Sequence, residues 1–331
     1  INELIQIMRN LAKEGKAIIL ITHKLQEIMD SASRCTIIRK GKLIDVVDVA
    51  STTKNELASK MVGRPVDFKV PKQPCKPGKA VLDIKNLSVL KEKKLTAVNN
   101  FSLDVHEGEI VGIAGVDGNG QSELVYALAG LMPTESGQVI LDGKDITKMS
   151  IRQRSEAGLG HVPEDRQKHG LVLQYSIAEN TVIKSYYTKA FQKHGFLLRD
   201  KINAFAKKIA EAFDVRSGQG IESKAGELSG GNQQKAILGR EITLDPKLLI
   251  AVNPTRGLDV GAIEAVHKEI VKHRDAGRGV LLISFELDEI FNLSDRIAVM
   301  HRGVLSGIVK PEETTAEEVG LMMAGMGGKN D

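Results

Sequence analysis

A glycine-rich segment, GVDGNGQS at residues 115–122, has the residue types and spacing of a loop that binds phosphate. It follows an apolar run ending at Ala114 and precedes a helical pattern. Glycines at such a turn let backbone N–H groups converge on phosphate oxygens, and the helix N-terminus adds a favourable dipole. The candidate phosphate-binding residues are Gly115, Asp117, Gly118, Asn119, Gly120, Gln121 and Ser122. The position that should hold the lysine of this pattern holds glutamine.

A second segment, LSGGNQQK at residues 228–235, opens a predicted helix that continues through Glu241. A serine and two glycines at a helix start offer a hydroxyl and backbone amides to an anion. This string is far less expected from composition than the first pattern. The candidate residues are Leu228, Ser229, Gly230, Gly231, Asn232 and Gln233. For both segments the alternative is a glycine turn without a ligand.

The elements around these segments alternate between strand and helix patterns. Residues 81–89 and 97–105 read as strands, 109–115 as a buried strand and 121–129 as a helix. The apolar runs 248–252 and 280–284 suit parallel strands covered on both faces. Residues 166–242 are mostly helical in pattern, most clearly 201–213. The sequence therefore predicts an α/β nucleotide-binding core interrupted by a helical subdomain.

An internal repeat determines the predicted domain organisation. GKAIILITHKLQEI from Gly15 aligns without gaps on GRGVLLISFELDEI from Gly277, and the register persists from Gly63 to Gly325. The alternative is that any two strand–helix units of a parallel sheet look alike. We expect a duplicated domain of about 260 residues: the end of the first copy at 1–64, a proline-rich extended linker at 65–79, and the second copy at 80–326. The chain also starts inside a helical pattern, as expected for a fragment.

Composition excludes several classes of protein. The net charge is +4 and is spread along the chain, which does not indicate nucleic-acid binding. No stretch approaches the roughly 20 apolar residues that cross a bilayer, so a membrane function requires another subunit. Cys35 and Cys75 form neither a disulfide framework nor a metal site, and a reducing cytosol is the simplest interpretation.

The order of the motifs resembles the second nucleotide-binding domain of a fused ABC-transporter ATPase. The motifs are the phosphate loop, VPEDRQKHGL at 162–171, LSGGNQQK at 228–235 and NPTRGLDVGA at 253–262. The chain is similar to the double-domain ATPases of importers for simple sugars and nucleosides. The sequences of its motifs are most similar to those of the nucleoside importers. The resemblance implies an α/β P-loop NTPase fold with an antiparallel β subdomain and an inserted helical subdomain. It also implies ATP and Mg²⁺ as cofactors.

Several functional residues of this family are replaced in the second copy. Gln121 stands for the phosphate-loop lysine. The magnesium-supporting aspartate falls on Val252, the water-polarising glutamate on Asn253, and the switch histidine on Phe285. Phosphoryl transfer needs each of these groups for positioning or charge stabilisation. One lost charge-assisted bond costs about 1.5–3 kcal/mol, so we expect ATP binding to weaken roughly ten- to a hundredfold and hydrolysis to suffer more.

The resemblance also implies an asymmetric pair of sites. His23 in the first copy matches the switch histidine, and the LSGG loop of 228–233 would complete the ATP site of the first domain. The missing N-terminal half of that domain would hold the working phosphate loop. Further implied positions are the crossing loop Gly257, Leu258 and Asp259, the coupling loop Glu164, Asp165 and Arg166, and Ser122 as a weak Mg²⁺ ligand. For Glu164 a plain surface role is the alternative.

The leading hypothesis is the ATP-binding subunit of an importer at the cytoplasmic face of the cell membrane. Its partners would be membrane-spanning permease subunits and, indirectly, an extracytoplasmic substrate-binding protein. A second hypothesis is a non-catalytic regulatory module that binds nucleotide without turnover. A third, a soluble twin ATPase acting on ribosomes or DNA, predicts basic surface runs that do not stand out here.

Overall fold

The computed structural model describes residues 2–22, 24–39, 41–66, 70–91 and 95–326. The chain divides into two compact units, each described by itself below. The first unit comprises Ile1–Lys69 with Leu258–Ala265, and the second comprises Val70–Gly257 with Val266–Asp331.

The first unit contains short helices and one β-hairpin. Its elements are α1 (Asn2–Lys13), α2 (Leu25–Ser31), β1 (Arg34–Arg39), β2 (Lys42–Asp48) and α3 (Lys54–Val62). Leu57 and Ala58 of α3 are fully buried in a small apolar core with Ile37 of β1. The helical pattern near the N-terminus is confirmed by α1, but the apolar run at 18–22 is not a strand, and Ile19 and Ile21 are 90% and 94% exposed.

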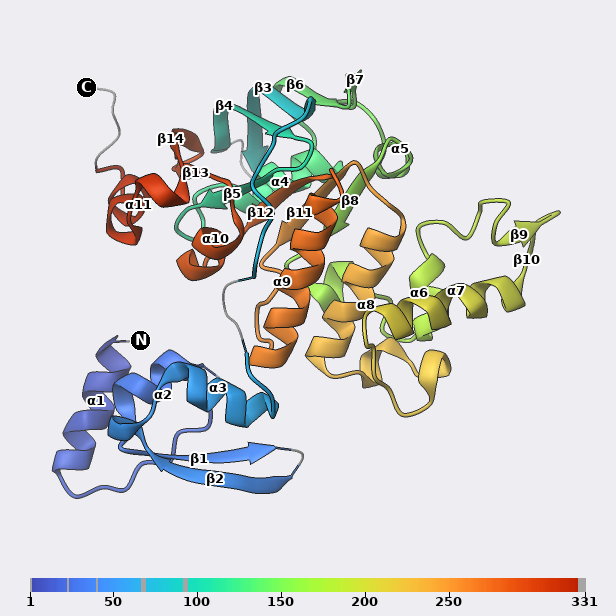
Figure 1. Ribbon diagram of the computed structural model, residues 1–331. Coiled ribbons are helices and arrows are strands. Elements are labelled where there is room, and N and C mark those ends of the chain that lie inside the picture. Colours follow the sequence, from blue (N-terminus) through green and yellow to red (C-terminus); the bar gives the residue numbers. More distant parts are fainter. Residues whose placement is uncertain (1, 23, 40, 67–69, 92–94, 327–331) are drawn as a thin grey trace. The chain divides into compact units, whose positions relative to one another are not determined.

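The second unit is built on a six-stranded sheet in the order β14-β13-β5-β12-β11-β8 (Figure 1). Its strands are β5 (Ile110–Ala114), β8 (Leu159–Val162), β11 (Leu248–Val252), β12 (Gly279–Ile283), β13 (Arg296–His301) and β14 (Val304–Val309). All neighbours are parallel except β14, which pairs antiparallel with β13. Every residue of β5, β11 and β12 is buried, which confirms the prediction of strands covered on both faces.

A four-stranded antiparallel sheet packs on the same core. Its order is β4-β3-β6-β7, with β3 (Ala80–Lys91), β4 (Leu95–His106), β6 (Ser136–Leu141) and β7 (Lys144–Asp145). One apolar cluster joins both sheets to the helix after β5, with Phe101, Leu124 and Ile250 fully buried in it. The remaining helices of this α/β part are α4 (Gln121–Ala129), α5 (Ile151–Glu156), α10 (Leu287–Leu293), α11 (Ala316–Met323) and the part of α9 (Val260–Asp275) that follows Ala265.

The predicted helical insertion is present and lies to one side of the six-stranded sheet (Figure 1). It consists of α6 (Ile177–Val182), α7 (Arg199–Ala212) and α8 (Gly230–Thr243). The prediction of a mostly helical region was incomplete. A short hairpin of β9 (Gln192–Lys193) and β10 (Phe196–Leu197) separates α6 from α7. Together with both sheets, these helices confirm the P-loop NTPase architecture with its two subdomains.

The internal repeat recurs in the structure. α2, β1, β2 and α3 correspond to α10, β13, β14 and α11 at the same offset as the sequence alignment. Both β-hairpins contain an irregularity at the equivalent step, Ile37/Ile38 and Val299/Met300. Both C-terminal helices begin with a complete capping box, at Thr53 and at Thr315. Two unrelated strand–helix units with similar sequences would not need to share both this irregularity and these capping boxes.

The described part of the proline-rich segment is extended and mostly exposed, but it is fastened to the second unit. Lys72 Nζ donates to the carbonyl oxygens of Leu293 and Ser294 at 2.9 and 2.8 Å. The buried Arg274 donates to the carbonyl of Gln73 at 2.7 Å. The predicted extended linker thus has local contacts with the second unit at Lys72 and Gln73.

Candidate functional site

The phosphate loop lies between β5 and α4, and its glycines adopt backbone conformations that other residues disfavour. Gly118 and Gly120 have φ of +85° and +103°. A Cβ on Gly120 would lie 2.3 Å from the carbonyl oxygen of Ala97, so the strand β4 leaves no room for a side chain. Gly120 is also the N-cap residue of α4. The predicted strand, loop and helix are thus confirmed as an arrangement that can bind an anion through backbone amides.

Asn119 fastens the loop to the turn between β13 and β14. Its Nδ2 donates to the carbonyl of Met300 at 3.2 Å, and its Oδ1 accepts from the N–H of Arg302 at 3.2 Å. The N–H of Gly303 donates to the Asn119 carbonyl at 2.8 Å. Asn119 therefore holds the loop shape, whereas Asp117 and Gly118 are exposed at its outer edge.

Gln121 is turned back into the loop. Its side chain is 3% exposed, and Nε2 donates to the carbonyl of Val116 at 3.2 Å. Its Oε1 is buried and, within the described residues, has no hydrogen-bond partner. A neutral amide thus occupies the position where the phosphate-loop pattern has a lysine. Its Oε1 can accept a hydrogen bond from a donor.

The replaced residues at the end of β11 form one structure. Val252 is buried at the end of the strand, and Asn253 follows with φ +43° and 6% exposure. Asn253 Oδ1 accepts a hydrogen bond from the N–H of Phe285 at 3.0 Å. Two of the positions predicted to be degenerate therefore contact each other, and this carboxamide braces the turn after β12.

The residues present do not fit a dedicated Mg²⁺ site. Val252 offers no oxygen, and the carboxamide oxygen of Asn253 is engaged with Phe285. Ser122 contributes one half-buried hydroxyl. Among the residues described, no group of three or more histidine, cysteine or acidic side chains could hold a metal ion. A magnesium ion here would rely mainly on nucleotide phosphates and water.

The signature loop at the start of α8 has the predicted form. Ser229 is exposed and is the N-cap residue of α8, with its Oγ accepting from Asn232 Nδ2 at 3.0 Å. Leu228 and Gln233 are buried, and Gln233 Nε2 donates to the carbonyl of Ala225 at 3.0 Å. No hydrogen bond connects this loop to the phosphate loop in the described part of the chain.

Arg166 joins three predicted segments. Its Nη1 donates to the carbonyl of Arg256 at 3.0 Å, and Arg256 forms an ion pair with Glu164. A Cβ on Gly230 would lie 2.5 Å from Arg166 Nη2, and one on Gly257 would lie 3.8 Å from it. The coupling loop, the signature loop and the start of the crossing loop are therefore neighbours.

Asp165 and Asp259 stabilise loop ends. Asp165 accepts from the N–H groups of Gln167 and Lys168, which lowers the pKa of its carboxyl. Asp259 accepts from the N–H of Ala262 at 2.9 Å. Leu258 is buried. His23 lies outside the described residues.

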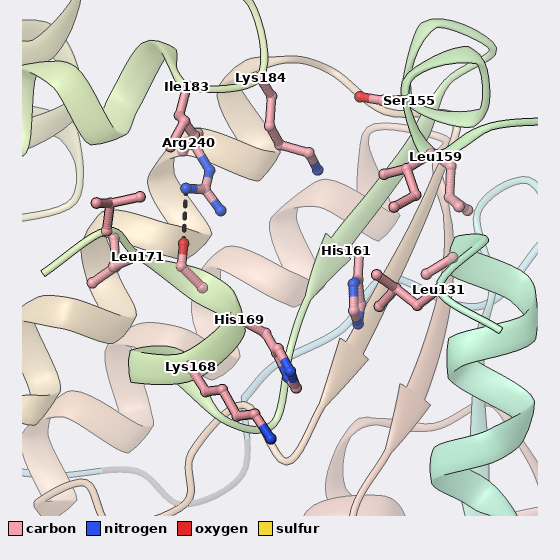
Figure 2. A pocket seen from close by; sticks show the side chains of 14 residues that line it. Leu131, Ser155, Leu159, His161, Lys168, His169, Leu171, Ile183, Lys184 and Arg240 are labelled. Atoms are coloured by element: carbon pink, nitrogen blue, oxygen red, sulfur yellow. Dashed lines mark hydrogen bonds between the residues drawn. The ribbon is translucent and has the colours of Figure 1, made fainter. Parts of the chain in front are cut away.

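A cavity of about 370 Å³ lies beside the coupling loop (Figure 2). Its wall includes Leu131, His161 of β8, Lys168, Lys184 and Arg240 of α8. Burial lowers the pKa of His161 to about 4, and its Nε2 has no hydrogen-bond partner within the part of the chain that the structure describes. The recess therefore combines apolar side chains with one buried polar atom that could bond to a ligand.

Buried charges stabilise the wall of this cavity. Glu241 is 1% exposed, and its carboxylate pairs with Lys184 at 2.6 Å and Arg240 at 2.9 Å. Burial alone would raise the pKa of Glu241, but these two cations lower it to about 2. Arg240 also donates to the carbonyl of Gly170 at 2.9 Å, which ties α8 to the segment that follows the coupling loop (Figure 2).

Sequence reasoning missed these charged residues and Arg256. Arg256 lies inside the segment NPTRGLDVGA, directly before the predicted crossing loop. This position in the sequence could have identified it as a candidate site residue. Glu241 and Arg240 sit on a helix whose other buried positions are apolar or amide, and nothing in their spacing distinguishes a buried ion pair from a solvated one.

Comparison with known proteins identifies related sequences. Residues 98–256 match the family described as ABC transporter. The nucleoside import ATP-binding protein NupA of Lactococcus lactis subsp. cremoris is 54% identical over 325 residues, which are 98% of this chain and 64% of that protein. The ribose import ATP-binding protein RbsA 1 of Agrobacterium fabrum is 37% identical over 96% of this chain and 61% of that protein.

A solved nucleotide-free ATP-binding cassette from an ABC transporter shares the fold. The TM-score is 0.59 at 21% identity, over 74% of this chain and 96% of that chain. The present chain spans less than two thirds of the length of the two importer proteins. None of the described helices is long and apolar enough to cross a membrane.

Proposed function

We propose that this chain is part of the ATP-binding subunit of an ABC transporter, of the type found in sugar and nucleoside importers, because residues 98–256 match the ABC transporter family and a nucleoside import ATP-binding protein is 54% identical over 325 residues. In this proposal the second unit binds ATP without efficient hydrolysis and completes a second ATP site with its signature loop. The observation that carries the proposal is the combination of an ordered signature loop with a catalytic turn that has no carboxylate at Val252 or Asn253.

Impaired hydrolysis follows from the groups at the end of β11. A general base must accept a proton from the attacking water, and a carboxamide has no basic site for this. The Asn253 oxygen is also engaged with the N–H of Phe285. Phe285 itself offers no polar group to the γ-phosphate. Binding depends instead on the backbone amides of the phosphate loop and the α4 dipole.

The signature loop is proposed to act on a nucleotide held elsewhere. Ser229 is exposed, and the first backbone N–H groups of α8 point out of the helix start, as at any helix N-terminus. In this proposal that nucleotide belongs to the ATP site of the first domain of the repeat. His23 is its switch histidine, and residues outside this chain supply its phosphate loop.

A permease segment is proposed to dock in the cavity beside the coupling loop. The cavity is lined by apolar side chains and by Lys168, and it borders the loop that Arg166 connects to the signature helix. A docked segment there would contact α8 at Arg240 and, at Gly170, the segment that follows the coupling loop. This contact would place the chain at the cytoplasmic face of the membrane.

We propose a nucleoside as the transported compound. The support is the higher identity to a nucleoside importer protein than to a ribose importer protein, 54% against 37%. Simple sugars are the other class implied by the sequence. Selectivity belongs to the permease and the substrate-binding protein, so these identities indicate the type of system rather than a contact.

A non-catalytic regulatory module is the second candidate, and the missing carboxylates favour it. Uptake of labelled nucleosides and simple sugars by cells separates the two. The cells would carry the complete transporter with Ser229→Ala in the signature loop or Gln121→Ala in the phosphate loop.

We expect the Ser229→Ala variant to lose most nucleoside uptake and the Gln121→Ala variant to lose much less. The reason is that only Ser229 contributes to the site that hydrolyses ATP in this proposal. The control is Ser217→Ala, which changes a half-buried serine of the helical insertion whose hydroxyl donates to the carbonyl of Gly220. Equal losses in the Ser229 and Gln121 variants would contradict the asymmetric pair. Unchanged uptake in all variants would favour the regulatory module.

A further inference from the structure

The hairpin of β9 and β10 ends in a tight turn that presents its side chains outward. Lys193 pairs with Phe196 across a two-residue turn of His194 and Gly195, whose φ angles are both positive. Such a turn matches the twist of the two strands and makes the hairpin rigid for its size. Gln192 Oε1 accepts from the N–H of Gly195 at 2.9 Å and closes the turn. In Figure 1 the hairpin projects at the end of α7.

The tip of this hairpin is both apolar and basic. Phe196 is 78% exposed and Leu197 is 50% exposed. Around them lie the exposed cations Lys189, Lys193, Arg199 and Lys201, against the single acid Asp200. These 13 residues carry a net +3, whereas the whole chain of 331 residues carries +4. None of the four cations forms an ion pair with another described residue.

We propose that residues 189–201 form a peripheral anchor that binds a bilayer surface containing anionic phospholipids. An exposed phenylalanine with adjacent cations is the side-chain pattern of segments that lie in the headgroup region. The cations are attracted to the negative surface potential, and the aromatic ring enters the boundary between headgroups and acyl chains.

The observations favour a lipid surface over a protein groove. The tip is a two-residue turn between two short strands, and its exposed Phe196 and Leu197 lie in a segment whose cations form no ion pair with a described residue. Long, unpaired lysines match a diffuse layer of negative charge better than a single carboxylate.

The anchor goes beyond the proposed function, because it requires no permease and no nucleotide. It assigns to this chain a membrane contact of its own. If the chain does not bind vesicles, the importer hypothesis is unaffected. If the uptake experiment contradicts the importer hypothesis, binding to vesicles can still be tested.

A tryptophan reporter tests the proposal directly. The chain contains no tryptophan, so Phe196→Trp introduces a single indole at the tip, and Leu321→Trp places one at an exposed site on α11 as the matched control. Each purified chain is titrated with vesicles of phosphatidylcholine, with and without about 30% phosphatidylserine. We expect a blue shift of emission for the Phe196→Trp chain on anionic vesicles only, and no shift for the control.

Charge reversal supplies the second arm. The double variant Lys189→Glu/Lys193→Glu should weaken binding to anionic vesicles by roughly tenfold or more, as should raising the ionic strength from about 0.05 to about 0.5 M. Lys144→Glu/Lys148→Glu, with the same charge change on and beside β7, should bind nearly as the unmodified chain. Unchanged circular dichroism establishes that each variant is folded. Equal binding to neutral vesicles, equal loss in both double variants, or no binding of the unmodified chain would overturn the anchor.

Discussion

At the residue scale, Gln121 is the position in the phosphate loop where we expect a substitution to change nucleotide binding most. Its neutral amide already lies inside the loop, with Nε2 on the Val116 carbonyl. A lysine at this position would supply the charge-assisted contact that is absent. We expect Gln121→Lys to tighten Mg-ATP binding by roughly tenfold to a hundredfold, measured by titration calorimetry.

Gln121→Met is the control for this substitution, because it changes the side chain without adding charge. It should not tighten binding. If both variants bind alike, charge at this position has no bearing on affinity, and the account of the loop is wrong.

Asn253 supports the turn after β12 through its side chain. We expect Asn253→Ala to lower the free energy of unfolding by about 1–3 kcal/mol, because the half-buried N–H of Phe285 loses its acceptor and alanine disfavours a φ of +43°. Urea unfolding measures the change. Asn100→Ala is the matched control, since Asn100 has φ +50° but is exposed. Similar losses in the two variants would mean that the backbone alone accounts for the effect.

The sequence predicted which residues lie at the site better than it predicted their contacts. The phosphate loop and the signature loop follow from glycines and serines at helix starts, because backbone geometry restricts the residues allowed there. The contact between Asn253 and Phe285 joins two strands that are 32 residues apart, and only the sheet order reveals it.

At the scale of elements, the two copies of the repeat make a matched test. Thr53 and Thr315 each cap a helix through a reciprocal pair with Glu56 or Glu318. We expect Thr53→Ala and Thr315→Ala to cost about 0.5–2 kcal/mol each and to speed exchange of the amides in the first turn of α3 and of α11. Hydrogen-exchange mass spectrometry measures both. Faster exchange in only one helix would contradict equivalent roles for the two caps.

The interface between β8 and α8 makes stability depend on pH. The pKa of His161 is lowered from 6.5 to about 4, so between these values the unfolded chain binds a proton that the folded chain does not. Stability should therefore fall as pH drops from about 6.5 to about 4. Glu241, with a pKa lowered from 4.5 to about 2, should add a further loss only below about 4.5.

Unfolding of the His161→Gln variant across this range tests the first of these windows. The fall between pH 6.5 and 4 should become shallower, while His194→Gln, a change at the exposed hairpin turn, should leave the profile unchanged. An identical slope in the His161→Gln variant would show that other groups, such as the buried His273 whose pKa is also lowered to about 4, account for the pH dependence.

Element prediction succeeded where periodicity was strong and failed where tertiary pairing decides. α4 and β11 begin and end at the predicted residues, since a glycine turn and an unbroken apolar run bound them. The run at 18–22 resembles β12 in sequence but pairs with no strand among the described residues. The hairpin at 192–197 was missed because two-residue strands leave no periodic signal.

At the scale of the whole molecule, the predicted fold is confirmed, while the asymmetric pair of sites remains a proposal. The same chain combines an ordered signature loop, a phosphate loop without its cation and a catalytic turn without a carboxylate. These features lie in separate segments of the sequence. Each supports the same proposal, in which this domain binds nucleotide and assists hydrolysis at the ATP site of another domain.

The most direct test of this claim is phosphate release by the unmodified chain, recorded on the same sample whose Mg-ATP binding is measured by calorimetry. We predict measurable binding with no turnover above the rate without protein, because neither Asn253 nor Phe285 can activate water or sense the γ-phosphate. Brisk phosphate release by this chain would contradict the account, since another residue would then have to replace the missing base.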